Sequence, residues 1–113
     1  MRLGELIKTE TQEGKEKHVP VIEFVPCPEC GEKTIKITVG REVPHPNTVE
    51  HHIKWIGLFG VKDGIAVHIG TFDLGPALGI PTVAVHVKLE GIQELIAVEY
   101  CNLHGLWESS LSV

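Results

Sequence analysis

Apolar and polar side chains alternate with a period of two in three segments of this chain, and this alternation restricts its fold more than any other feature. The three segments are residues 34–39, 65–69 and 83–89. Such a period indicates strands with one buried and one solvated face. Further β-rich runs, bounded by Gly, Pro or Asp, are 19–25, 53–59, 94–100 and the tail from Leu106. Because no segment after residue 20 has a sustained helical period, we predict an all-β fold, an immunoglobulin-like antiparallel β-sandwich of about seven strands.

The length of the chain sets the expected number of domains. With 113 residues and 42% hydrophobic content, the chain suits one compact core, and two cores would both be under-packed. We therefore predict a single domain over residues 1–113, with residues 1–17 as an N-terminal arm. The i, i+3, i+4 spacing of Leu3, Leu6 and Ile7 predicts one helical turn that docks this arm.

Charge and composition exclude several classes of protein. The formal net charge of −5, without a cluster of Lys and Arg, argues against a nucleic-acid partner. No run approaches the ~20 apolar residues of a membrane span, and the first 18 residues lack the apolar region of a signal peptide, so we expect a soluble, cytoplasmic protein. Three cysteines are too few for a disulfide framework and, in a reducing compartment, indicate metal ligands or free thiols.

Three separate segments carry groups that bind metals. They are Glu16-Lys17-His18-Val19-Pro20, the run from His45 to His52, and the run from Tyr100 to Trp107 with Cys101 and His104. All three fall in loops or at strand ends, which a sandwich gathers at its two ends. Four imidazoles and one thiolate suit redox-active iron or copper better than structural zinc, which prefers four closed ligands. Blue copper is disfavoured, because its usual axial Met has no candidate except Met1.

On the motifs EKHVP, HPNTVEHHI and YCNLHGLW, the chain resembles the superoxide reductase family, also called neelaredoxin or the catalytic domain of desulfoferrodoxin. The resemblance implies one iron ion per chain with four equatorial imidazoles and an axial thiolate. Those ligands are His18, His45, His51, His104 and Cys101. It also implies that Glu16 occupies the sixth position in the ferric state and that Lys17 is the cation beside the open position in the ferrous state. We expect the backbone N–H groups of Leu103 and His104 to donate to the Cys101 sulfur.

The implied activity is the one-electron reduction of superoxide to hydrogen peroxide, for detoxification. A ferrous ion with four neutral imidazoles and one thiolate has a local charge of about +1, and Lys17 adds another, which attracts a small anion. The resemblance further implies a small electron-donor protein such as rubredoxin, and a homo-oligomer, either a dimer or a tetramer. The segment 71–81 looks shorter than the family's loop, a departure that bears on the oligomer interface and leaves the site motifs intact.

Alternative interpretations remain beside the iron site. A non-enzymatic zinc-binding module would use Cys27, Cys30, Cys101 and His104, although 71 positions separate Cys30 from Cys101, far more than zinc knuckles usually have. The Cys27 and Cys30 pair could also hold a structural metal across a subunit interface, form a reducible disulfide or remain as two thiols. Taken alone, Glu16 and Lys17 would be read as an exposed charge pair.

The remaining histidines and the tryptophans receive ordinary structural interpretations. His68 and His86 lie on the polar phase of alternating strands, so we assign them to solvated sheet faces. His52 follows a ligand candidate and should point the other way, near the site or at the surface. Trp55 and Trp107 are expected to pack in the core or form a wall of the site.

Overall fold

The computed structural model of the chain describes residues 1–27, 29 and 33–113. Within these residues, two short helical elements precede seven strands. The helical elements are α1 (Leu3–Leu6) and the 3₁₀ turn η1 (Glu10–Gln12). The strands are β1 (Val21–Val25), β2 (Lys33–Thr38), β3 (Ile53–Lys62), β4 (Ile65–Asp73), β5 (Thr82–Val87), β6 (Glu94–Cys101) and β7 (Gly105–Ser112).

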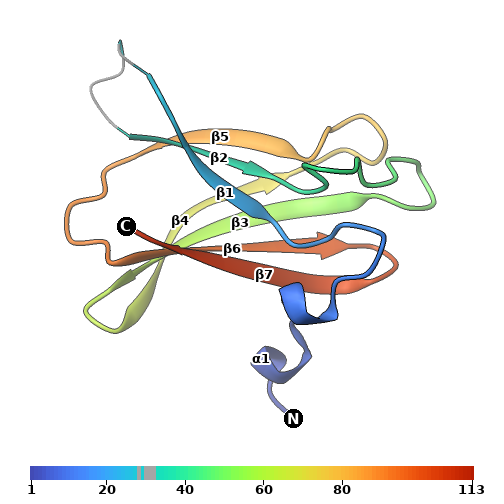
Figure 1. Ribbon diagram of the computed structural model, residues 1–113, viewed down its shortest axis with the longest axis horizontal. Coiled ribbons are helices and arrows are strands. Elements are labelled where there is room, and N and C mark those ends of the chain that lie inside the picture. The colour runs from blue at the N-terminus through green and yellow to red at the C-terminus, as the bar shows by residue number, and fades with distance from the viewer. Residues whose placement is uncertain (28, 30–32) are drawn as a thin grey trace.

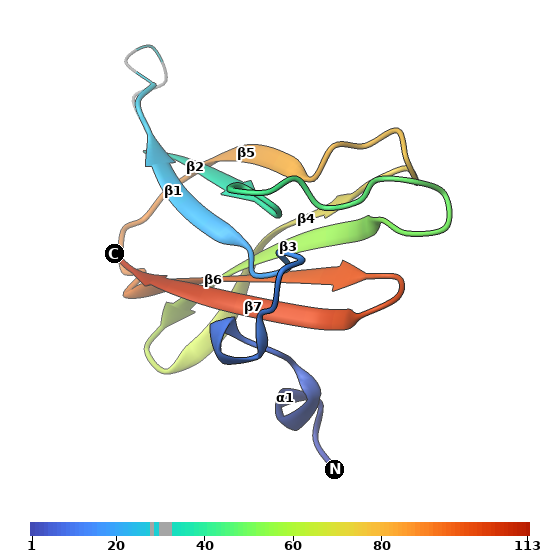
Figure 2. The same cartoon turned by 45° about the vertical axis from the view of Figure 1, so that its right-hand side comes forward.

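The strands form two antiparallel sheets that face each other (Figure 1). One sheet has the order β1-β2-β5 and the other has the order β4-β3-β6-β7. In the turned view of Figure 2, β1, β2 and β5 lie in one layer above β6 and β7. This arrangement is that of an immunoglobulin-like sandwich, in which the third and sixth strands pair at the centre of one sheet. The predicted fold class is therefore confirmed.

The core consists of the apolar side chains that the two sheets turn toward each other. In β2, Ile35 and Ile37 are fully buried, while Lys36 between them is only half-buried, as the alternation predicts. The buried cluster comprises Ile35, Ile37, Val39, Ile53, Ile56, Leu58, Val87, Leu95, Ala97 and Cys101. Cys101 thus belongs both to the core and to the end of β6, which gives its side chain a rigid support.

The β3–β4 hairpin is longer than the sequence pattern predicted. Its strands extend to Lys62 and from Ile65 to Asp73. They are joined by Asp63 and Gly64, whose φ angles of 52° and 74° match a two-residue hairpin turn of type I′. A register shift between Leu58 and Phe59 breaks the alternation, which explains why the pattern marked shorter strands.

The N-terminal arm is attached by its backbone. The predicted helical turn exists as α1, but Leu3 and Leu6 are 62% and 54% exposed, so these two leucines do not dock the arm as expected, whereas Ile7 is half-buried. Instead, Lys8 N–H donates to the Leu106 carbonyl over 3.0 Å, and Glu108 N–H donates to the Lys8 carbonyl over 2.9 Å. Backbone pairing with β7, which an apolar pattern cannot reveal, therefore fixes the arm beside the strand that follows His104.

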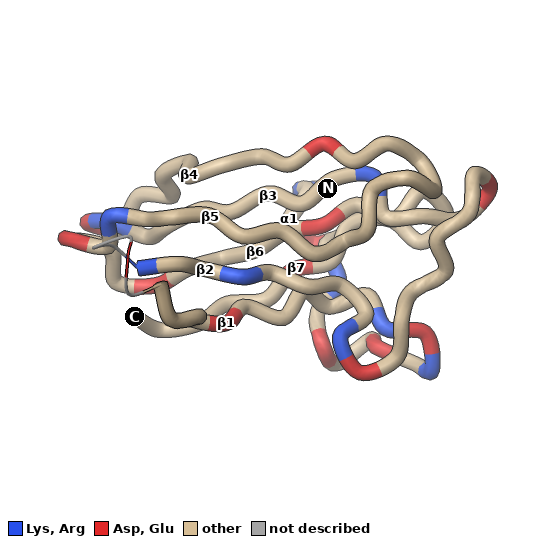
Figure 3. Tube along the Cα trace, turned by 90° about the horizontal axis from the view of Figure 1, so that it is seen from above, with Lys and Arg blue, Asp and Glu red and all other residues tan. Residues whose placement is uncertain are grey.

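Charged residues lie mainly away from the space between the sheets. Figure 3 shows acidic and basic positions in the N-terminal arm, in the loops at the two ends of the sandwich and also along strands such as β1 and β2. Among the described residues, no helix is long and apolar enough to cross a membrane.

Candidate metal centre

The three sequence motifs meet at one end of the sandwich. Their side chains come from the segment before β1 (His18), from the β2–β3 connection (His45, His51), from the last residue of β6 (Cys101) and from the β6–β7 turn (His104). Ile53, the first residue of β3, pairs with Cys101, so the β2–β3 connection and the β6–β7 turn leave the sheet side by side. The fold thereby brings His18 and His104, 86 positions apart in the sequence, to a ring-nitrogen distance of 3.2 Å.

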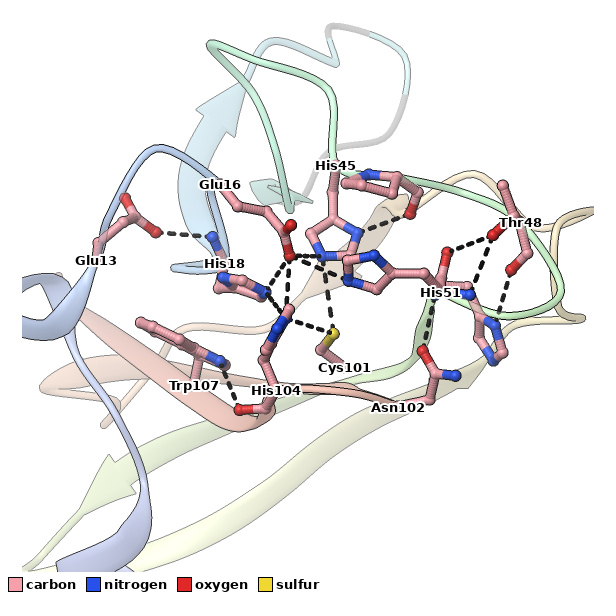
Figure 4. Close-up of polar contacts among 12 residues, drawn as sticks. Glu13, Glu16, His18, His45, Thr48, His51, Cys101, Asn102, His104 and Trp107 are labelled. Carbon is pink, nitrogen blue, oxygen red and sulfur yellow. Dashed lines mark hydrogen bonds and ion pairs between the residues drawn. The ribbon is translucent and has the colours of Figure 1, made fainter.

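A carboxylate oxygen of Glu16 lies among the four histidines (Figure 4). The distances from Glu16 Oε1 are 2.8 Å to His18 Nε2, 3.1 Å to His45 Nε2, 3.0 Å to His51 Nε2 and 3.1 Å to His104 Nδ1. The Cys101 sulfur lies 3.7 Å from His45 Nε2 and 3.8 Å from His104 Nδ1. In Figure 4 the thiol and the carboxylate approach the imidazoles from opposite sides. Six donor atoms of the predicted site thus converge on one small volume.

The spacing of these atoms fits a single metal ion. Glu16 Oε1 and His51 Nε2 are buried and lack a hydrogen-bond partner in the described part of the chain, although only 3.0 Å separates them. Short distances without hydrogen-bond geometry are expected when the lone pairs aim at a shared point between the atoms. Two donors that bind one metal ion at right angles, with bonds of about 2.1 Å, lie about 3.0 Å apart. The donor set therefore has the spacing of a coordination shell.

Burial keeps two of the imidazoles in the neutral form that binds metals. Loss of hydration, with a further contribution from His45, lowers the pKa of His18 to about 4. Loss of hydration likewise lowers the pKa of His45. His45 Nδ1–H donates to the Pro46 carbonyl over 2.7 Å, which directs the Nε2 lone pair at the cluster.

The Glu16 carboxylate is held in its ionised form. Burial alone would raise the pKa of Glu16, but the four surrounding histidines lower it overall. A cation bound among the same side chains would also lower the pKa of Glu16. Glu16 is therefore ready to bind a metal ion as an anion.

Cys101 must lose a proton to bind a metal. Its side chain is fully buried, and burial raises the pKa of the thiol above its ordinary value of 9.0. The backbone N–H groups of Leu103 and His104 donate to the sulfur and oppose that rise in pKa, so the predicted hydrogen bonds are confirmed. A metal ion that binds here near neutral pH therefore displaces the thiol proton.

Trp107 forms a wall of the site, as the sequence predicted. Its indole stacks on the His18 ring at a centroid distance of 4.5 Å and an angle of 9°, and its Nε1–H donates to the His104 carbonyl over 3.3 Å. Sequence reasoning missed Lys8, whose amine donates to the same carbonyl over 3.3 Å and lies 5.2 Å from the Trp107 ring centroid. A side-chain to backbone contact across 96 positions leaves no signal in the sequence.

Sequence reasoning also missed Glu99, which is fully buried in β6. Both of its carboxyl oxygens lack a hydrogen-bond partner in the described residues, and burial, with the charge of Glu13 adding, raises its pKa to about 9. A signal was available, because Glu99 has the same strand phase as Leu95, Ala97 and Cys101, which all face the core.

Lys17 is the one predicted site residue that the structure leaves outside the cluster. Its amine donates to the Gly14 carbonyl over 3.4 Å, and its side chain lines a cavity of about 200 Å³ together with Glu13 and Arg41. Glu16 lines a different cavity of about 360 Å³. Glu16 and Lys17 thus lie in different cavities, with the carboxylate among the four histidines.

The other histidines do not belong to the site. His52 is buried, and its Nδ1 contacts the Thr48 carbonyl over 3.0 Å, while its backbone N–H donates to Asn102 Oδ1 over 2.8 Å. It therefore fastens the loop that carries His51 to the β6–β7 turn. His68 and His86 are exposed on the sheets, as predicted.

The described members of the alternative zinc set, Cys27, Cys101 and His104, are not brought together. Cys30 lies outside the described residues, whereas Cys27 follows the end of β1 and His18 precedes its start, so these two residues are at opposite ends of that strand (Figure 1). Cys101 lies with His18, because their ligand atoms belong to a group within 4.8 Å of one another. A site that combines Cys27 with Cys101 and His104 is therefore not favoured.

Comparisons with known proteins identify the family of the chain. The sequence profile of the desulfoferrodoxin family matches residues 10–110. A Thermotoga maritima protein with a provisional superoxide reductase name is 45% identical, covering all of this chain and 97% of that protein. The superoxide reductase of Thermococcus kodakarensis is 38% identical over 98% of both chains. The solved structure of a superoxide reductase (neelaredoxin) from Ignicoccus hospitalis superimposes with a TM-score of 0.85 at 33% identity, covering 100% of this chain and 98% of the other. The chain therefore belongs to the desulfoferrodoxin family.

Proposed function

We propose that this protein is a superoxide reductase, which reduces superoxide to hydrogen peroxide at one iron ion. The ligands would be His18, His45, His51, His104 and Cys101. The observation that carries the proposal is the convergence of four imidazole nitrogens, each 2.8–3.1 Å from Glu16 Oε1, with the Cys101 thiol beside them. Membership of the desulfoferrodoxin family and the names of the relatives support it.

The donor set favours iron over zinc as the resident metal. Structural zinc takes four ligands and closes its shell, whereas this cluster offers six donors, one of them an exchangeable carboxylate. When bound, ferrous iron supplies the single electron that superoxide needs, and the Cys101 thiolate favours its release by donating electron density. The same thiolate would give the oxidised protein a visible absorption band.

The charge of the site suits a small anionic substrate. Neutral imidazoles, one thiolate and a divalent ion leave a local charge of about +1, although the whole chain is at −5. Attraction is therefore local, and rising salt should weaken it. Superoxide takes up one electron and two protons to become hydrogen peroxide.

Glu16 and Lys17 would alternate at the open position. With Glu16 in the cluster, the carboxylate blocks access, and its withdrawal would make room for superoxide. Lys17, the next residue, would then bring an ammonium group that attracts the anion and delivers a proton to the product. After the peroxide leaves, the return of Glu16 would close the site again.

The partners of the protein are part of this proposal. The His104 side chain is 45% exposed, against at most 18% for the other three histidines, so it would be the most accessible ligand for an electron from a small donor such as rubredoxin. Half-buried Trp55 and Phe59 line an apolar cavity of about 390 Å³ on the outer face of the four-stranded sheet, which supports a homo-oligomer, dimer or tetramer. A cytoplasmic location stays a prediction.

Metal analysis of matched variants tests the proposal. The parent protein should contain one iron per chain, and His45→Ala and His51→Ala should each reduce this content severely. His68→Ala is the control, because His68 is exposed and remote from the cluster, so it should retain iron. Cys101→Ser should abolish the thiolate absorption band of the oxidised protein. Zinc in place of iron, unaffected by the His45 and His51 substitutions, would favour the structural zinc module instead.

A further inference from the structure

The Glu13 carboxylate holds the backbone of a metal-ligating histidine. Its Oε2 accepts one hydrogen bond from the N–H of His18 and another from the N–H of Val19, both at 2.7 Å; Figure 4 shows the first of them. The side chain is half-buried, and hydrogen bonds from amides to an ionised carboxylate are among the stronger ones in proteins. Glu13 therefore fixes the chain at the point where it enters the site.

Glu13 itself has a firm support. The backbone of Lys8 pairs with β7, and η1 follows with a capping box in which Thr9 and Gln12 bond reciprocally. The Glu13 N–H then donates to the Glu10 carbonyl over 3.3 Å. The backbone of Glu13 is thus attached to the sandwich through η1 and Lys8, and its carboxylate is attached to the backbone of His18.

These bonds close a short loop of four residues, 14–17, between two fixed ends. The loop contains Glu16, which lies in the metal cluster, and Lys17, which lies outside it. Gly14 has no atom within 4 Å of where a Cβ would lie, and Lys15 is exposed, so the first half of the loop has room to move. The ring of His18, by contrast, is stacked on Trp107.

We infer that Glu13 is a positioning residue, which lets Glu16 move on and off the metal while His18 stays in place. Without it, a shift of residues 16 and 17 would pass directly to the adjacent ligand His18. By tying both ends of the loop, Glu13 also keeps Glu16 at a high effective concentration beside the metal. The inference rests on the proposed function, because its consequence is the movement of Glu16 at the metal. The clamp, by which we mean the two hydrogen bonds from the His18 and Val19 amides to the Glu13 carboxylate, does not depend on that function.

The test compares Glu13→Ala and Glu13→Gln with the parent in the iron-loaded, oxidised protein. Azide, a small anion, should compete with Glu16 for the open position. Glu13→Ala should raise the apparent affinity for azide by roughly tenfold, because a looser loop returns Glu16 less often. Glu13→Gln keeps an acceptor without the charge and should give a smaller rise, of about threefold. Glu10→Ala, which removes an exposed carboxylate from the same arm, should leave azide affinity unchanged.

Hydrogen exchange supplies a second readout that does not depend on the metal. The amides of His18 and Val19 should exchange at least about tenfold faster in Glu13→Ala than in the parent or in Glu10→Ala. If Glu13→Ala fails to take up iron, Glu13→Gln carries the azide comparison. Equal azide affinities in the Glu13 and Glu10 variants, or unchanged exchange of the two amides, would overturn the inference. A parent protein that binds no iron would refute the proposed function, whereas the exchange result would still decide whether Glu13 is a clamp.

Discussion

Glu99 offers a quantitative test of the buried environment beside the candidate metal site. Its carboxyl group is fully buried and has no hydrogen-bond partner among the residues that the structure describes, and burial raises its pKa from 4.5 to about 9. Between these values the folded protein binds a proton that the unfolded chain has released, so stability must fall as the pH rises from 4.5 to about 9. The slope is about 1.4 kcal/mol per pH unit, which amounts to about 4 kcal/mol between pH 5 and pH 8 as an upper bound.

The substitution Glu99→Gln removes this titration while keeping the shape of the side chain. Any fixed cost of burying the amide shifts the free energy of unfolding equally at every pH. The difference in stability between variant and parent should therefore grow in favour of the variant as the pH rises from 5 to 8. Urea unfolding at a series of pH values, with both proteins at the same metal loading, measures this difference. Parallel curves for the two proteins would refute the argument that Glu99 is protonated in the fold.

Three further predictions concern the support of the site. Gly40→Ala should destabilise the protein by about 1–3 kcal/mol and reduce its iron content, because Gly40 has a φ of 79° and an added Cβ would lie 2.5 Å from the backbone nitrogen of His45. An unchanged melting temperature would contradict this prediction. Trp107→Leu should lower the free energy of unfolding by about 3 kcal/mol and alter the visible spectrum of the oxidised protein, because it removes the stacking on His18 and the hydrogen bond to the His104 carbonyl. An unchanged spectrum would count against a role of Trp107 in positioning these two histidines. Metal affinity, measured by competition with a chelator, should rise about tenfold from pH 7 to pH 8, because the Cys101 thiol, whose pKa is raised, must release its proton; a flat profile would mean that sulfur is not a ligand.

Much of the fold could be predicted because the strands carry their own pattern. Residues 34–39 and 83–89 alternate cleanly, and both became strands that pair with each other in β2 and β5. The boundaries of β3 and β4 were less accessible, since the register shift after Leu58 interrupts the period. The contact of Lys8 with β7 could not be predicted, because it uses backbone groups that every residue has.

The candidate ligand set could be proposed from the sequence because its residues have distinctive chemistry and fall at loop positions. Their convergence follows from the sandwich, which brings the start of β1, the β2–β3 connection and the β6–β7 turn together. The supporting contacts were not accessible. In the sequence, Glu13 looks like an ordinary exposed glutamate of a polar arm. Only the path of the chain brings its carboxylate within hydrogen-bond distance of the His18 and Val19 amides. The position of Lys17 depends in the same way on loop conformation.

The central claim is that this site reduces superoxide without dismutating it. The most direct measurement mixes the fully reduced, iron-loaded protein with a limiting amount of superoxide and quantifies both hydrogen peroxide and oxygen. A reductase oxidises one iron and yields one peroxide for each superoxide, with no oxygen released. Half that peroxide, together with oxygen, would indicate dismutation, and no reaction at all would contradict the proposed function.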